Sequence, residues 1–190
     1  MEKKHIITIG GLLGSGKSSA AKLVAEKLAY THYSAGDLMR QLAKENGYDD
    51  IRDFNLASEG TTSADDQVDE RTRQIGETGS NIVFDGHMSW RFIPGSFKVF
   101  LTLDSQMAAE RILGSMTPER KASEHVTDDA SAYAKLLDER KSSNVRRYEA
   151  LYGVDPYRPD YYDCIIDTRD SNPEQVAEKI INAYELWLKD

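Results

Sequence analysis

Residues 11–18 read Gly11-Leu12-Leu13-Gly14-Ser15-Gly16-Lys17-Ser18, and this stretch decides the fold of the chain. It fits the phosphate-binding loop pattern, in which spaced glycines are followed by lysine and then serine or threonine. A β-branched run at 5–9 precedes it, and apolar residues recur after it at helical spacing through Leu28. A strand, a glycine-rich loop and a helix in this order predict a site for the phosphates of a nucleotide.

The residues of this loop have distinct expected roles. The glycines let backbone N–H groups converge on an anion, beside the positive end of the dipole of the following helix. The ammonium of Lys17 would reach the β- and γ-phosphates, and the hydroxyl of Ser18 would bind Mg²⁺. The alternative, an ordinary glycine turn, is disfavoured by the Lys-Ser pair and by both flanking segments. We therefore expect ATP and its Mg²⁺ ion to bind here, with contacts from Gly11, Gly14, Ser15, Gly16, Lys17, Ser18 and Ser19.

The composition limits what kind of protein can carry this loop. The 190 residues are 39% hydrophobic and 29% charged, which is typical of one soluble globular domain. The net charge of −8 argues against general binding to nucleic acids or anionic membranes, and no apolar run is long enough to span a bilayer. We expect a cytoplasmic protein in which Cys164, the single cysteine, is a core residue and not a disulfide partner. The oligomeric state is left open.

Strand-like and helix-like segments alternate along the rest of the chain. A short strand is expected at 31–34, and runs rich in apolar residues at 81–86, 97–104 and 162–167 indicate further strands between helical segments. Such strands, separated by helices, are typical of a parallel sheet covered on both faces. The sequence thus predicts one α/β domain over residues 1–190, with a P-loop NTPase fold and a five-stranded parallel sheet.

A polar stretch at 114–129 lacks apolar periodicity and is long for a connection within a compact domain, which predicts a lid. Arg111 lies just before this stretch, and Arg140 and Arg147 follow it on a helix expected at 130–152. Because Arg140 and Arg147 are two helical turns apart, they share one helix face. Each arginine alone is more typical of a solvated surface charge. Together they suit the charge of a transferred phosphoryl group, so we expect Arg111 and Arg140 to act in catalysis.

Two further segments follow predicted strands. They are Ser34-Ala35-Gly36-Asp37 and Asp85-Gly86, and ligands of open α/β sheets bind at such strand ends. We therefore expect both segments to converge with the phosphate loop. Asp85 is a candidate to hold Mg²⁺ through a metal-bound water, and a carboxylate that only caps a turn is the alternative. No N-K-x-D segment follows a later strand, which argues against a GTPase.

With these motifs in view, the chain resembles the cytidylate kinases, specifically the short archaeal-type proteins of that family. The resemblance covers nearly the whole chain, through Gly11–Ser18, Ser34-Ala35-Gly36-Asp37 with Arg40, Asp65-x-x-x-Asp69-x-Arg71, Asp85-Gly86, Arg111-Ile112, Arg140 to Arg147-Tyr148, Tyr152-Gly153-Val154-Asp155 and Tyr162 to Thr168. It implies an acceptor-binding region at about 34–80 and a lid at about 114–129. It also implies acceptor contacts from Ser34, Gly36, Asp37, Arg40, Asp85 and Arg147.

Three positions depart from the usual pattern of the family. His87 follows Gly86 where arginine is usual, and Gly114-Ser115-Met116 stands where the lid usually has a second arginine. Asn144 occupies a position that often carries an acid. His87 would be either a replacement contact to the acceptor or a polar rim residue. Arg91 would share in binding the acceptor phosphate.

The expected activity is ATP-dependent phosphorylation of a nucleoside monophosphate, with CMP or dCMP as the acceptor. A P-loop kinase with another acceptor, such as AMP or a nucleoside, is the first alternative. The second is a nucleotide-binding regulatory module that kept the fold and lost turnover, and the departures at His87 and in the lid keep this alternative open. The expected partners are these nucleotides, without nucleic acid or membrane.

Overall fold

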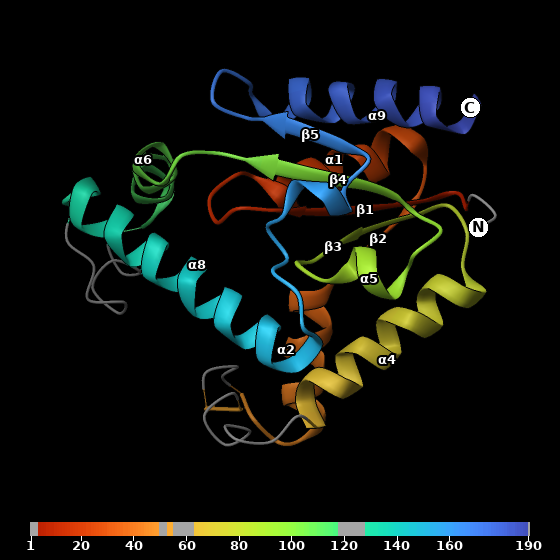
Figure 1. Cartoon of the computed structure of the whole chain (residues 1–190), viewed down its shortest axis with the longest axis horizontal. Coiled ribbons are helices and arrows are strands. Elements are labelled where there is room, and N and C mark those ends of the chain that lie inside the picture. The colour runs from red at the N-terminus through yellow and green to blue at the C-terminus, as the bar shows by residue number, and fades with distance from the viewer. Residues whose placement is uncertain (1–3, 50–52, 55–62, 118–127, 190) are drawn as a thin grey trace.

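A parallel sheet forms the centre of the protein, in a computed structural model that describes residues 4–49, 53–54, 63–117 and 128–189. Within these residues the sheet has five strands in the order β2-β3-β1-β4-β5, and every neighbouring pair is parallel (Figure 1). The strands are β1 (Ile6–Gly11), β2 (Thr31–Ser34), β3 (Ile82–Asp85), β4 (Phe97–Thr102) and β5 (Cys164–Asp167). The predicted fold class is therefore confirmed.

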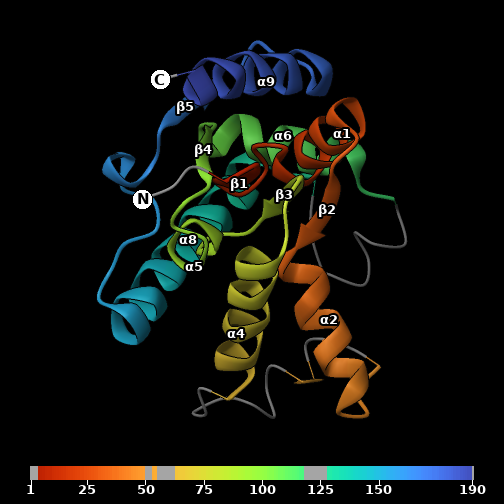
Figure 2. The ribbon, with the colours of Figure 1, turned by 90° about the vertical axis from the view of Figure 1, so that its right-hand side faces the viewer.

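Helices cover both faces of this sheet (Figures 1 and 2). They are α1 (Lys17–Leu28), α2 (Ala35–Glu45), α4 (Ser63–Thr78), α5 (Ser89–Phe92), α6 (Ser105–Ser115), α8 (Ala130–Tyr152) and α9 (Pro173–Lys189), with a 3₁₀ turn, η1, at Pro159–Tyr161. Helices α1 and α9 lie together on one face, whereas α4 and α5 lie on the other. The sequence-based expectation of a helix at 130–152 matches α8 residue for residue, but α5 and η1 were missed.

Side chains of β1 show why both faces are covered. Ile7 and Ile9 belong to a core with α1 and α9, whereas Ile6 points the opposite way into a core with α2 and α4. Alternate residues of a strand face opposite sides of a sheet, so an apolar run on β1 supplies both cores at once. On α9, Val176, Ile180 and Tyr184 are buried in the first of these cores, as the helical spacing predicts.

The region predicted at 34–80 contains α2 and α4, which project side by side away from the sheet (Figure 2). Leu38 and Leu42 of α2 pack with Ala64 and Val68 of α4, so the projection has an apolar core of its own. Of the lid predicted at 114–129, residues 118–127 lie outside the described part of the chain.

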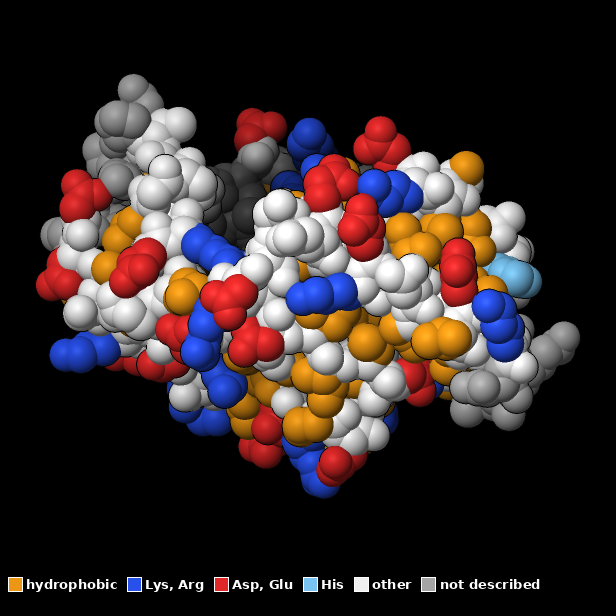
Figure 3. Space-filling view, turned by 90° about the horizontal axis from the view of Figure 1, so that it is seen from above, with side chains coloured by type: hydrophobic (Ala, Val, Ile, Leu, Met, Phe, Trp, Pro, Cys, Tyr) orange, Lys and Arg blue, Asp and Glu red, His pale blue; other side chains and the backbone are white. Residues whose placement is uncertain are grey.

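Few of the large apolar side chains in the described part of the chain are exposed. Leu136, Ile165 and Leu186 are exposed, and Cys164 is half-buried beside the core of α1 and α9 rather than enclosed in it. The face seen in Figure 3 mixes hydrophobic side chains with charges of both signs. None of the helices that the structure describes is both long enough and apolar enough to cross a membrane.

Candidate functional site

The phosphate loop turns sharply between β1 and α1. Gly14 and Gly16 have φ angles of 74° and 83°, in the left-handed region that glycine enters without strain. A Cβ atom on Gly14 would lie 2.7 Å from the Cβ of Ala108 on α6, so no side chain fits there. The loop therefore packs tightly against α6 and leads directly into the N-terminus of α1 at Lys17, where backbone N–H groups suit an anion.

The side chain of Lys17 folds back over its own loop. Its Nζ donates to the backbone oxygens of Gly11 at 3.0 Å and Leu12 at 2.9 Å. Burial lowers the pKa of Lys17 to about 8, and the nearby carboxylate of Asp85 opposes this effect. The ammonium thus remains mainly charged at neutral pH, and it lies where phosphate oxygens could replace the two carbonyl acceptors.

A cavity lies on each side of this loop. The first, here called the strand-end cleft, has a volume of about 370 Å³ and contains the predicted residues Lys17, Ser18, Ser34, Gly36, Arg40, Asp85, His87 and Arg147. The second, the loop-side cavity, has about 490 Å³ and is lined by Gly14, Ser15, Gly16, Ser19, Arg111 and Thr168 among others. The three strand-end segments therefore converge on one cleft, as the sequence predicts.

Asp85 is buried at the end of β3, and its carboxylate has a partner that sequence reasoning missed. The Nε2 atom of His32, on the neighbouring strand β2, lies 2.9 Å from Oδ2 of Asp85. Ser18 and Asp85 together offer Mg²⁺ a hydroxyl and a carboxylate, and no group of three or more metal-binding side chains occurs among the described residues. This small donor set fits Mg²⁺, which takes its remaining ligands from phosphates and water.

His87 is the described residue with an unsatisfied buried polar atom. Its Nδ1 is buried in the strand-end cleft without a hydrogen-bond partner, while its ring contacts the rings of Tyr148 and Tyr157. Burial lowers the pKa of His87 to about 3, helped by the positive charges of Lys17 and Arg147. The imidazole is therefore neutral at physiological pH and can form a hydrogen bond to a ligand but cannot supply charge.

The arginines in the strand-end cleft are paired with carboxylates. Arg40 forms an ion pair with Asp37, which is itself exposed. Arg147 forms one with Asp65 of α4, and both residues line the cleft. Arginine is well suited to bidentate phosphate contacts, so each guanidinium could exchange its carboxylate for a phosphate.

The remaining predicted arginines lie elsewhere. Arg111 borders the loop-side cavity, where its guanidinium donates to the backbone oxygens of Thr168 and Arg169 at 2.7 Å each. Arg140 is exposed on α8 and borders neither the cleft nor the loop-side cavity. Arg91 lines a different cavity, described next, rather than the cleft.

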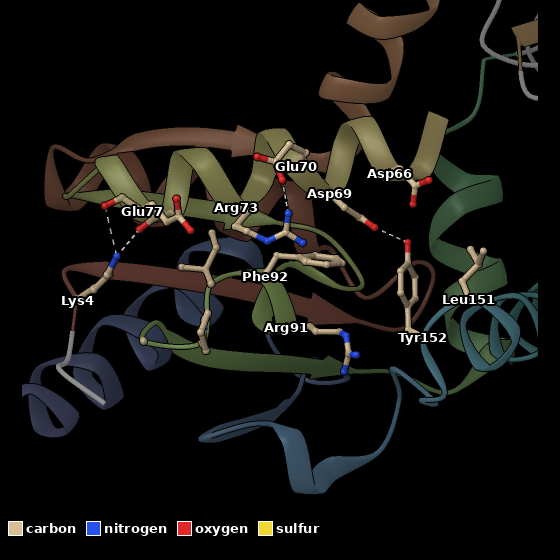
Figure 4. A pocket seen from close by; sticks show the side chains of 14 residues that line it. Lys4, Asp66, Asp69, Glu70, Arg73, Glu77, Arg91, Phe92, Leu151 and Tyr152 are labelled. Atoms are coloured by element: carbon tan, nitrogen blue, oxygen red, sulfur yellow. Dashed lines mark hydrogen bonds and ion pairs between the residues drawn. The ribbon is translucent and has the colours of Figure 1, made fainter. Parts of the chain in front are cut away.

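This third cavity, the α4–α5 cavity, has a volume of about 990 Å³ and is the largest of the three (Figure 4). Asp69, Phe92 and Tyr152 line both it and the strand-end cleft, so they form the boundary between them. The hydroxyl of Tyr152 donates to Oδ2 of Asp69 at 2.5 Å across this boundary. Sequence reasoning gave these residues no role, although Asp65 and Asp69 are one helical turn apart and so share a face.

Fold and site together define a class: a phosphate-loop protein with the architecture of small-molecule kinases. The solved shikimate kinase of Bacteroides thetaiotaomicron shares this fold, with a TM-score of 0.62 at 15% identity, over 96% of this chain and 98% of that one. The profile of the cytidylate kinase-like family matches residues 6–170, and the chain belongs to this family.

Curated relatives agree over nearly the full length. The cytidylate kinase of Methanocaldococcus jannaschii is 32% identical over 185 residues, covering 95% of this chain and 97% of that protein. The cytidylate kinase of Thermoplasma volcanium is 35% identical over 183 residues, covering 94% of this chain and 90% of that protein.

Proposed function

We propose that this protein transfers the γ-phosphoryl group of ATP to CMP or dCMP. The observation that carries the proposal is the position of the phosphate loop between two cavities. Lys17 and Ser18 face the strand-end cleft, whereas Gly14, Gly16 and Ser19 face the loop-side cavity. A reaction between two nucleotides needs a site on each side of the transferred phosphoryl group. The relatives named cytidylate kinase support cytidine monophosphate as the acceptor.

The donor would bind in and over the loop-side cavity. The triphosphate would lie along the backbone N–H groups of Gly14 to Ser19, and the rest of ATP would extend toward Arg111 and Thr168. Because Arg111 is anchored to two backbone carbonyls, its guanidinium forms a fixed planar wall of this site. Mg²⁺, held by Ser18 and through water by Asp85, would supply positive charge at the β- and γ-phosphates.

The acceptor would bind in the strand-end cleft with its phosphate toward Lys17. Arg40 and Arg147 would exchange Asp37 and Asp65 for the acceptor phosphate, and neutral His87 would donate or accept one hydrogen bond. Lys17 would then move from the carbonyls of its loop to the γ-phosphate and follow the negative charge during in-line transfer. The chain contributes position and charge, without a covalent intermediate.

Arg140, unlike Arg40 and Arg147, does not line the cleft in this structure. Since its side chain is exposed and outside the cleft, it would contribute only when the chain after α6 closes over the nucleotides. Its catalytic role, and the lid at 114–129, remain proposals.

The proposal is tested by measuring ADP release in a coupled assay with CMP, dCMP, UMP and AMP as acceptors. We expect the highest kcat/KM with CMP or dCMP. A higher value with AMP or UMP would reassign the acceptor. ATP binding without turnover on any acceptor would instead leave a nucleotide-binding regulatory module.

A further inference from the structure

We infer that Asp69 recognises the exocyclic amino group of the cytosine base and so selects cytidine over uridine nucleotides. This inference deepens the proposed function and rests on it, because it assumes that the strand-end cleft holds the acceptor. It concerns a residue on α4 that lies on the boundary with the α4–α5 cavity, away from the motifs that bind phosphate.

The strand-end cleft has two chemically different ends. At one end Lys17 and Ser18 belong to the phosphate loop and the start of α1. At the other end stand Asp69, Phe92 and Tyr152, which also line the α4–α5 cavity. A nucleoside monophosphate whose phosphate reaches Lys17 therefore extends its base toward this second end.

The second end has the composition of a base-binding site. Phe92 and Tyr152 meet edge to face, with ring centroids 5.8 Å apart, and Tyr152 stacks on Tyr148 at 6.0 Å. Val68, buried on α4 next to Asp69 in the sequence, adds an aliphatic side chain to the lining of the cleft. Aromatic and aliphatic side chains bind the faces of a base with little preference among bases, so specificity must come from polar groups at the base edge.

Asp69 is the polar group placed to read that edge. Two carboxylates of α4 line the cleft, but Asp65 is engaged by Arg147 in an ion pair. Tyr152 donates a hydrogen bond to Oδ2 of Asp69, which orients the carboxylate (Figure 4). Oδ1 would then be the oxygen that accepts from a ligand. Arg73 of α4, whose charge also acts on Asp69, is paired with Glu70.

An ionised carboxylate only accepts hydrogen bonds, and this decides which pyrimidine it selects. Cytosine presents an amino group at N4, a donor, whereas uracil presents a carbonyl oxygen at the same position. Burial raises the pKa of Asp69 to about 6, with Asp65 and Asp66 acting in the same direction and Tyr152 and Arg73 opposing them. At pH 7.5 Asp69 is thus mainly ionised, accepts from N4 and repels O4.

The test is a calorimetric measurement of CMP and UMP affinity for the full chain and for Asp69→Asn, at pH 7.5. We expect the natural protein to prefer CMP, and the substitution to lower the CMP-over-UMP affinity ratio by about tenfold to a hundredfold. The reason is that the amide can also donate to O4 of uracil. Asp69→Ala should lower the ratio as well. Asp66→Asn is the matched control, because Asp66 is exposed and borders only the α4–α5 cavity.

The inference is overturned if the natural protein binds both nucleotides equally, or if both Asp69 variants keep its preference. It is also overturned if Asp66→Asn changes the ratio as much as Asp69→Asn does. Since binding is measured without turnover, these results are distinct from a failure of the proposed function, in which no acceptor is phosphorylated although CMP binds.

Discussion

The loop-side cavity and the strand-end cleft, on the two sides of the phosphate loop, differ in the groups that form them. In the loop-side cavity the loop turns on glycine backbone, and Arg111 is fixed by backbone carbonyls of residues 168 and 169. In the strand-end cleft Arg40, Arg147 and Asp85 are each paired with another side chain, which is Asp37, Asp65 and His32 respectively. A backbone site recognises what all nucleoside triphosphates share, whereas a side-chain site can be re-specified by single substitutions. We therefore assign selectivity to the cleft and general nucleotide binding to the loop.

The largest expected effect comes from Lys17, where the two sides meet. We expect Lys17→Ala to lower kcat at least about a hundredfold, because the ammonium acts most strongly on the charge of the transition state. Steady-state ADP release with MgATP and CMP measures this. Lys22→Ala, an exposed lysine of the same helix, is the control. Near-normal turnover of Lys17→Ala would refute the assignment of the loop.

A second substitution separates the two sides. We expect Arg147→Ala to raise the KM for CMP by tenfold or more and to change the KM for ATP little. Losing a charge-assisted hydrogen bond to phosphate costs about 1.5–3 kcal/mol. The exposed neighbour Arg146 supplies the control substitution to alanine. An equal rise in the KM for CMP and the KM for ATP would contradict the assignment of the acceptor to the cleft and the donor to the loop-side cavity.

Arg40→Ala should also raise the KM for CMP and change the KM for ATP little, with an effect similar to or smaller than that of Arg147→Ala. The reason is that the side chains of Arg40 and its partner Asp37 are more exposed than those of Arg147 and Asp65. Initial rates with either substrate varied in turn provide the two KM values. An effect on ATP alone would place Arg40 on the donor side.

A smaller effect is expected from His87, and it tests whether a neutral imidazole forms a hydrogen bond to the acceptor. We expect His87→Phe to raise the KM for CMP about three- to tenfold, the value of one neutral hydrogen bond. Because the pKa of His87 is lowered to about 3, the difference between the two proteins should stay constant from pH 5.5 to 8. Activity profiles against pH for both proteins check this. A difference that appears only below pH 6.5 would show that the imidazolium is the active form.

The same contrast explains what the sequence could predict. The loop motif, the strand runs and the helix at 130–152 depend on local spacing, which the chain displays directly. A local cap is equally direct: Asp104 stands immediately before α6, and its carboxylate accepts from the backbone N–H of Met107. The four residues of α5 are too few to show a period, so the direction of Arg91 could not be inferred.

Pairs between distant residues were out of reach for the same reason. Arg147 and Asp65 are 82 positions apart, and Tyr152 and Asp69 are 83 apart. They meet through side-chain contacts between α8 and α4, which the fold and not the local sequence determines. The seven-residue spacing of Arg140 and Arg147 predicted one shared helix face; both residues lie on α8, but Arg140 lies outside the cleft that Arg147 lines.

The last prediction concerns the cost of holding a carboxylate in the cleft. The pKa of Asp69 is raised from an ordinary value of 3.8 to about 6, mainly by burial, so the folded protein binds this proton more tightly than the unfolded chain. Stability is therefore lost as the pH rises from about 4 to above 6, and at pH 7.5 the ionised form destabilises the fold. Partial exposure to solvent reduces the penalty, and we expect about 1 kcal/mol.

Asp69→Asn removes the charge and keeps an oxygen that can accept from Tyr152. We expect this variant to be about 1 kcal/mol more stable than the natural protein at pH 7.5 and equally stable near pH 3, where Asp69 is mainly protonated in both folded and unfolded states. Urea unfolding at the two pH values measures the difference, and Asp66→Asn should show no such gain. If the variant gains stability at pH 7.5 while its CMP-over-UMP ratio falls, the cleft keeps Asp69 ionised at the expense of stability because ligand recognition requires it. An unchanged or lower stability at pH 7.5 would mean that solvent or Tyr152 already compensates the charge.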